Sequence, residues 1–370
     1  MNMKRISIIV LLVISARAAE AQGCVAIRSN GATCTMTGAH AEGTPAEHGS
    51  WTLGVNARYF KSYKHFVGKA EQHERAEAGT EVVNYNFTTE FGLTRNINNR
   101  WSLSVYAPVI SNVRSSMYEH YGNASKNPNA RRKTKSFGLG DVRAAAYYWL
   151  VDPMKNSKAN VQVGAGIKLP TGDYRYTDYF FRNDTTKILG PVDQSIQLGD
   201  GGTGFTTEFN AFYRVSKTVS LYTNGFYLFN PREHNGVSTA RGSVPAATAI
   251  AYGSDVMSVP DQFMYRLGAN LSAGDFFFSG GMRIEGVPAR DLIGGSEGFR
   301  RPGYVLSAEP VIGYKVKKTQ FYLSVPYSVE RNRTQSVPDK NRTRITGVYA
   351  QGDAAFADYS INFGAVFSLK

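Results

Sequence analysis

Residues 262–286 read QFMYRLGANLSAGDFFFSGGMRIEG. Apolar residues recur at every second position from Phe263 to Ala273, and the alternation resumes at Phe276 after Gly274-Asp275. A period of two is typical of a β-strand, because successive side chains point to opposite faces. A Gly-Asp pair between two such runs predicts a hairpin. Each run has about the ~9–11 residues that a tilted strand needs to cross a bilayer.

The second face of this hairpin decides the fold class. It carries Arg266, Arg283 and Glu285, which cannot face lipid. A closed barrel with apolar side chains outside and polar ones inside satisfies both faces and every backbone hydrogen bond. We therefore predict an all-β protein, a transmembrane antiparallel up-and-down β-barrel in the outer membrane of a Gram-negative cell.

The same alternation recurs through the chain and predicts about 12 strands, an even number as in bacterial barrels. Besides the hairpin, the strands are expected near Trp51–Tyr59, Val83–Leu93, Trp101–Val109, Phe137–Val151, Val161–Leu169, Phe205–Val215, Val219–Phe229, Tyr304–Tyr314, Phe321–Val329 and Ala355–Leu369.

Short and long connections alternate between these strands. The short ones are expected at Asn96–Asn99, Asp152–Lys158, Ser216–Thr218, Gly274-Asp275 and Val316–Lys318. The long ones are expected at Lys61–Glu81, Val113–Ser136, Gly172–Gly204, Pro231–Asp261, Val287–Pro302 and Arg333–Asp353. This pattern predicts short periplasmic turns and long extracellular loops. A soluble β-sandwich or propeller is the alternative fold, and it would not explain loop lengths that are long on one side only.

The N-terminus has the features of a secretory signal peptide. Lys4 and Arg5 precede the apolar run Ile6 to Ile14, and Ala19-Glu20-Ala21 supplies small residues for cleavage. We expect residues 1–21 to be the signal peptide and residues 49–370 to form the barrel. Residues 22–48 show no strand pattern and are expected to be either a loose periplasmic segment or a plug inside the barrel.

The chain has two cysteines, Cys24 and Cys34. In an exported protein this pair predicts a disulfide. Lipidation at Cys24 is the alternative, although the preceding Ala21-Gln22-Gly23 lacks the leucine of a typical lipidation signal.

The predicted register places charged side chains of both signs in the lumen. The positive candidates are Arg58, Arg143, Lys168, Arg214, Arg266 and Arg283, and the negative ones are Glu90, Glu208, Glu285, Glu309, Glu330 and Asp358. Because the two signs balance, a strongly ion-selective pore is not expected. The charges could form ion pairs that fill a narrow barrel, or they could line a polar path for a substrate.

The formal net charge of +13 must then lie mostly in loops, turns and termini. Expected loop residues include Lys61, Lys64 and Lys69 and the run Arg131, Arg132, Lys133 and Lys135. Such loops are expected to contact outer-membrane lipid, in particular the phosphates of lipopolysaccharide, or simply to be solvated. In an exported chain of this kind we expect no nucleic-acid partner.

Sequence signatures of catalysis are missing. The chain contains no His-Glu-x-x-His motif and no cysteine pair at metal-binding spacing. Its one Gly-x-Ser-x-Gly match, Gly294–Gly298, falls in the expected loop Val287–Pro302 and not between a strand and a helix. The glycine-rich run Gly199–Gly204 lacks the Lys-Ser/Thr of a phosphate-binding loop. We therefore expect neither an enzyme nor a cofactor.

Three segments carry a resemblance to a known family: Phe137-Gly138-Leu139-Gly140-Asp141, the stretch Gly166–Asp173, and Gly202-Thr203-Gly204-Phe205. Over roughly Phe137–Arg214 the chain resembles outer-membrane transporter-like proteins associated with phenol meta-pathway degradation, a group similar to the FadL-type carriers of hydrophobic compounds. The resemblance implies a monomeric barrel that passes small hydrophobic or aromatic compounds. The final Lys370 departs from the usual terminal aromatic residue, although assembly by the barrel-insertion machinery is still expected.

The function expected from these features is passive uptake of a small hydrophobic ligand. The alternative is a barrel without transport, whose loops serve adhesion, surface integrity or complex formation.

Overall fold

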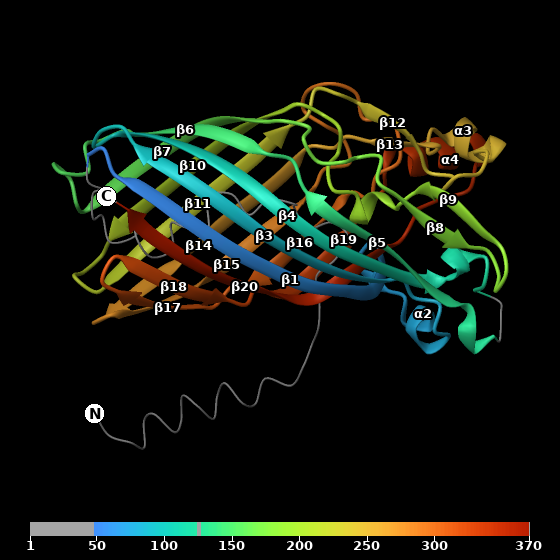
Figure 1. Cartoon of the computed structure of the whole chain (residues 1–370), viewed down its shortest axis with the longest axis horizontal. Helices are drawn as coiled ribbons and strands as arrows, with labels where there is room; N and C mark the ends of the chain where they lie inside the picture. The colour runs from blue at the N-terminus through green and yellow to red at the C-terminus, as the bar shows by residue number, and fades with distance from the viewer. Residues whose placement is uncertain (1–47, 124–126, 370) are drawn as a thin grey trace, which may run out of the picture.

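The computed structural model describes residues 48–123 and 127–369. The predicted signal peptide, nearly all of segment 22–48, Cys24 and Cys34 lie outside this part. The long strands wrap diagonally around one barrel (Figure 1). Nine passes of the wall are single strands: β1 (Trp51–Val67), β3 (Val83–Asn96), β4 (Trp101–Met117), β7 (Ala159–Lys168), β10 (Gly204–Arg214), β11 (Val219–Phe229), β14 (Gln262–Ala273), β15 (Phe276–Val287) and β20 (Ala354–Leu369).

The other three passes are each broken into two strands. They are β5 (Arg131–Leu139) with β6 (Arg143–Trp149), β16 (Gly303–Ala308) with β17 (Val311–Val316), and β18 (Thr319–Ser324) with β19 (Tyr327–Arg333). Pro310 and Pro326 lie in two of the breaks, because proline has no N–H to donate to a ladder. The barrel therefore has twelve antiparallel passes, as predicted.

The first and last passes close the barrel. Strands β1 and β20 pair from Trp51 with Leu369 to Phe66 with Ala354. Closure leaves the wall without a free edge at this seam, which is the condition for crossing a membrane with strands.

Side-chain burial along the strands is the inverse of that in a soluble protein. On β14, Arg266 is 2% exposed, whereas Tyr265 and Leu267 are 43% and 65% exposed. Buried polar residues and exposed apolar residues alternate in this way on most strands. An apolar outer band around a polar interior identifies an outer-membrane β-barrel.

The two ends of the barrel differ in the way that the sequence predicts. Long connections span residues 68–82, 118–130, 169–203, 230–261, 288–302 and 334–353. They gather at the end opposite the C-terminus (Figure 1). Their short elements are β2 (Ala70–Glu71), α2 (His73–Glu77), η2 (Tyr118–His120), η3 (Pro128–Ala130), β8 (Thr177–Phe181), β9 (Lys187–Pro191), η4 (Gln194–Ile196), β12 (His234–Ser238), α3 (Ala247–Tyr252), β13 (Val256–Ser258) and α4 (Val337–Thr346).

Several strands are longer than predicted, and on two of them this changes the place of predicted loop residues. Lys61 and Lys64, expected in a loop, lie on β1, and Arg131 to Lys135 lie on β5. The apolar pattern of β1 ends at Tyr59 because the next outward residue, Lys61, is charged, but the backbone ladder continues. Within the described residues, no helix has the length and apolar character needed to span a bilayer.

Candidate functional site

Most of the predicted lumen residues lie in the barrel interior. Ten are at most 6% exposed: Arg58, Glu90, Arg143, Lys168, Glu208, Arg266, Arg283, Glu285, Glu309 and Asp358. Arg214 is half-buried at the end of β10, beside a short turn. The placement of the twelfth residue, Glu330, differs from the prediction.

Glu330 lies in the middle of β19 with 37% of its side chain exposed. Its carboxylate accepts a hydrogen bond from the Tyr304 hydroxyl at 2.6 Å and pairs with Lys69 at 2.7 Å. The register explains this position: Leu306 pairs with Glu330 but Ser307 pairs with Ser328, so Val329 is an extra residue. A one-residue bulge moves the following side chains to the opposite face.

An ion-pair network crosses the barrel interior. Arg58 on β1 reaches Glu285 on β15 at 2.8 Å, although three wall passes separate these strands. Glu285 also pairs with Arg283 at 2.6 Å, and Glu309 pairs with Arg266 at 2.7 Å. Because each buried charge has a partner of opposite sign, this part of the lumen is filled and nearly neutral.

A second cluster lies on the opposite wall. Arg143 on β6 pairs with Glu208 on β10 and lies 4.2 Å from the centre of the Tyr106 ring. The Tyr147 hydroxyl donates to Glu208 at 3.0 Å. The cluster combines charge with aromatic surface, so this wall presents both to the lumen.

The three segments that carry the family resemblance converge at the break between β5 and β6. Asp141 accepts hydrogen bonds from the backbone N–H of Gly172 at 3.0 Å and of Asp200 at 3.2 Å. Lys168 pairs with Asp200 and lies 3.6 Å from Asp141. A Cβ atom on Gly199 would lie 2.5 Å from Asp141 Oδ1, so only glycine permits this approach. The segments therefore hold both ends of loop 169–203 against the wall.

The part of loop 169–203 that follows β9 folds into the barrel. The short helix η4 carries Ile196, which is 0% exposed. Asn112 and Ser136 on the wall donate hydrogen bonds to its carbonyl. On the other side Gln194 donates to the carbonyls of Ser258 and Phe299, both at 3.0 Å.

Asp193 anchors the inward part of this loop. Its two carboxylate oxygens accept from Arg301 at 2.9 Å each, and Arg114 and Arg241 lie 3.6 and 3.4 Å away. Burial alone would raise the pKa of Asp193, but Arg114 and Arg301 outweigh burial and hold it well below its usual range. The anchor is therefore ionised at neutral pH.

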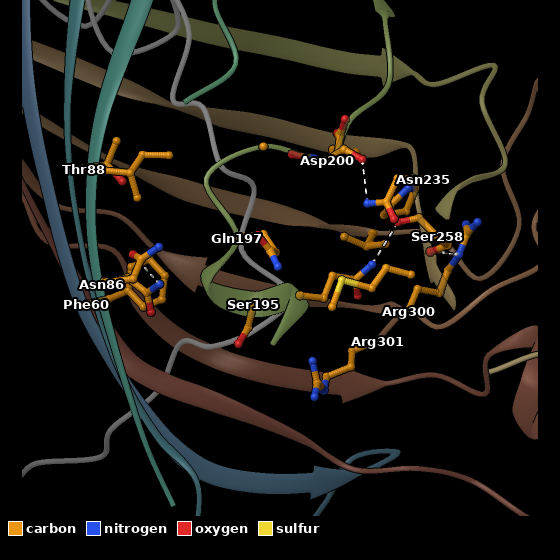
Figure 2. Close-up of a pocket in the computed structure, with 18 of the residues that line it drawn as sticks. Phe60, Asn86, Thr88, Ser195, Gln197, Asp200, Asn235, Ser258, Arg300 and Arg301 are labelled. Atoms are coloured by element: carbon orange, nitrogen blue, oxygen red, sulfur yellow. Dashed lines mark hydrogen bonds between the residues drawn. The ribbon is translucent and has the colours of Figure 1, made fainter. Parts of the chain in front are cut away.

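A cavity of about 100 Å³ remains between this loop and the wall. Figure 2 shows Phe60, Asn86 and Thr88 on the wall side and Ser195 and Gln197 on the loop side. The rest of the lining is also mixed, with Arg58, Ile110, Asn112, Gln194, Gly199, Asp200, Asn235, Met257, Ser258, Pro260, Gln262, Val287, Arg300 and Arg301.

A smaller cavity of about 30 Å³ shares Ile110, Asp200 and Gln262 with the first. Its other lining residues include the apolar side chains of Leu198, Phe226 and Leu228 and the charged Arg143 and Lys168. The two cavities therefore adjoin one another at the three shared residues.

Comparison with solved structures supports this architecture. The chain is similar to an outer-membrane channel from Pseudomonas putida F1, with a TM-score of 0.57, 10% sequence identity, and coverage of 87% of this chain and 96% of that one. The two chains share a fold.

Weaker likenesses include a toluene transporter from Ralstonia pickettii (TM-score 0.39, 8% identity, 88% of this chain and 90% of that one) and a monoaromatic hydrocarbon channel (TM-score 0.39, 8% identity, 87% and 89%). We draw nothing from these two. No protein-family model and no curated protein sequence matches the chain.

The sequence analysis missed the inward loop. Asp193, Arg114 and Arg301 were not among the predicted site residues, because they lie on a loop, a strand end and another loop far apart in the chain. The signal that the sequence did contain was the trio of glycine-rich segments, which the sequence analysis used only for the family resemblance. Among the described residues, no group of three or more His, Cys, Asp or Glu could hold a metal ion.

Proposed function

We propose that the protein is a narrow, passive outer-membrane channel for small hydrophobic or aromatic compounds, with loop 169–203 as its constriction. The observation that supports the proposal is the position of η4 inside the barrel, beside a cavity of about 100 Å³. A cavity of ~150 Å³ holds a benzene molecule in a well-studied case, so this space is on the scale of one ring after small side-chain movement.

The lining favours a small ring that bears a polar group. Phe60, Ile110 and Met257 offer apolar contact, while Asn86 and Ser195 offer hydrogen bonds. Binding sites for small molecules commonly combine an apolar lining with a few polar groups that orient the ligand. A hydrated sugar ring is too large for this space.

Flux into liposomes tests the proposal. The purified barrel should admit phenol faster than protein-free liposomes do and should exclude glucose. Passage of both solutes would indicate a general pore, and passage of neither by folded protein would contradict transport. Heat-modifiable migration on a gel reports that the barrel is folded.

Asp193→Ala provides a sharper test, because it removes the anchor of the constriction. We expect flux of glucose to rise several-fold as the loop leaves the lumen. Asp184→Ala is the matched control: Asp184 lies in the same loop, is about half exposed, and pairs with Arg132 outside the lumen. Equal flux through both variants would show that the loop does not limit passage.

The alternative is a closed barrel with a structural or adhesive role. The Arg58–Glu285 bridge across the lumen favours it, because a bridge of this kind obstructs the interior. In that case neither solute would pass even through the Asp193→Ala variant.

We also infer from the single closed barrel that the protein acts as a monomer surrounded by outer-membrane lipid. We likewise propose that the barrel-insertion machinery assembles this barrel in the outer membrane. Both rest on the architecture rather than on transport.

A further inference from the structure

Basic side chains form a row on the lipid-facing side of the barrel, close to its extracellular end. Lys61 on β1 pairs with Tyr85 on β3. Tyr85 pairs with Val113 on β4, and Val113 pairs with Lys135 on β5. The ladder therefore places Lys61 and Lys135 in one row across the outward face of β1, β3, β4 and β5, and Lys133 follows two residues further out on the same face of β5.

A row of aromatic side chains lies next to the lysine row, on its periplasmic side. One step towards the periplasm, the ladder joins Tyr59, Phe87, Ser111 and Phe137, and the three aromatic side chains are 37%, 44% and 66% exposed. Aromatic residues of outer-membrane barrels concentrate where hydrocarbon meets headgroups. The lysine row thus lies at the headgroup level.

The height of the row agrees with this assignment. Trp51 marks the periplasmic end of β1, near the packed pair Trp101 and Tyr148. Lys61 is ten residues further along the strand. At ~3.3 Å per residue and a tilt of ~40°, that distance is roughly 25 Å along the barrel axis, the height of the apolar band of such barrels.

These lysines are available for an external anion. Lys61, Lys133 and Lys135 are exposed, and among residues 48–123 and 127–369 none of the three forms an ion pair with an acidic side chain. The nearby carboxylates have other partners: Asp178 accepts the backbone N–H of Lys135 at 2.8 Å, and Asp184 pairs with Arg132 at 2.8 Å. The Lys61 ammonium lies 4.5 Å from the Tyr63 ring centre, which holds it at the wall.

We propose that this face of β1, β3, β4 and β5 is a binding site for the phosphorylated headgroup of lipopolysaccharide. Three strand spacings of ~4.8 Å separate Lys61 from Lys135, about 14 Å, so the lysines can reach phosphates at the two ends of one disaccharide headgroup. Its acyl chains then lie along the exposed apolar rows below, beginning with Phe87 and Phe137. The proposal rests on the outer-membrane orientation of the barrel and not on transport.

The test is native mass spectrometry of the folded barrel in detergent with bis-phosphorylated lipid A. A lysine near an anionic lipid surface contributes roughly fivefold in affinity, so the K61Q/K133Q/K135Q variant should bind lipid A on the order of 100-fold more weakly. The matched control is K155Q/K217Q/K318Q, which removes three exposed lysines from the short turns at the other end and should bind as the parent does.

Two results would overturn the proposal: unchanged affinity in the K61Q/K133Q/K135Q variant, or an equal loss in the control. Inorganic phosphate at millimolar concentration should not displace lipid A, and displacement would assign the lysines to free phosphate instead of a lipid. Phenol flux through the same variant should be unchanged. A variant that loses lipid binding but keeps normal flux would show that this site acts independently of the channel. A barrel that binds lipid A but shows no flux would contradict the proposed channel and leave this site supported.

Discussion

At the residue scale, Glu285 is the centre of the lumen network. Its side chain is 0% exposed and accepts hydrogen bonds from Arg58 at 2.8 Å and Arg283 at 2.6 Å. Removing one member of a buried ion pair leaves a charge without compensation, which costs more than the pair itself contributes.

The substitution Glu285→Gln therefore tests whether the network supports the fold. It keeps the shape of the side chain but leaves two buried guanidinium groups without their shared carboxylate. We expect the free energy of unfolding to fall by about 3 kcal/mol, measured by urea titration in lipid vesicles. Glu330→Gln is the control, because the Lys69 pair is exposed and its loss should change stability little. Equal stability of the two variants would show that the network is dispensable.

Glu330 also shows where a register argument from sequence fails. Counting every second residue along β19 places its side chain inside, but the bulge at Val329 reverses the count. No residue near Val329 marks that bulge in the sequence, since bulges are set by pairing with the neighbouring strand. The same counting succeeded on β14 and β15, where the register is continuous.

At the scale of elements, the strands were predictable and the inward loop was not. A strand can be identified from a short stretch of sequence, because its apolar and polar residues alternate. The loop between β7 and β10 is placed by Asp193, whose partners Arg114 and Arg301 are 79 and 108 residues away. Contacts at such separations leave no periodic pattern, so composition alone could only show that a long loop exists.

The anchor of this loop leads to a prediction about pH. The folded-state pKa of Asp193 lies well below its usual range, so its contribution to stability is fully present above the unfolded pKa of ~3.9. That contribution is lost only as the pH falls through the still lower folded pKa. Flux of glucose, which carries no charge, should therefore be as low at pH 5 as at pH 7. A rise at pH 5 that matches the Asp193→Ala variant would mean that protonation releases the loop in the mildly acidic range.

At the scale of the whole molecule, charge is divided between two surfaces with different roles. Inside the barrel the positive and negative side chains form pairs, as Arg266 does with Glu309 and Arg143 with Glu208. On the lipid-facing side at the extracellular end, Lys61, Lys133 and Lys135 form no ion pair with an acidic side chain among the described residues. The net charge of +13 thus acts on the surroundings of the barrel more than on its lumen.

This division predicts weak ion selectivity for any current through the barrel. Strong selectivity requires a pore lined by one sign of charge, and the paired lumen has no such ring within the part that the structure describes. In planar bilayers with a potassium chloride gradient, the reversal potential should stay close to zero. Glu285→Gln removes one negative charge beside Arg58, which lines the larger cavity, and should shift the potential towards anion preference. A strongly selective parent channel would show that unpaired charges control the pore, and an unchanged potential in the variant would place the conducting path away from Arg58.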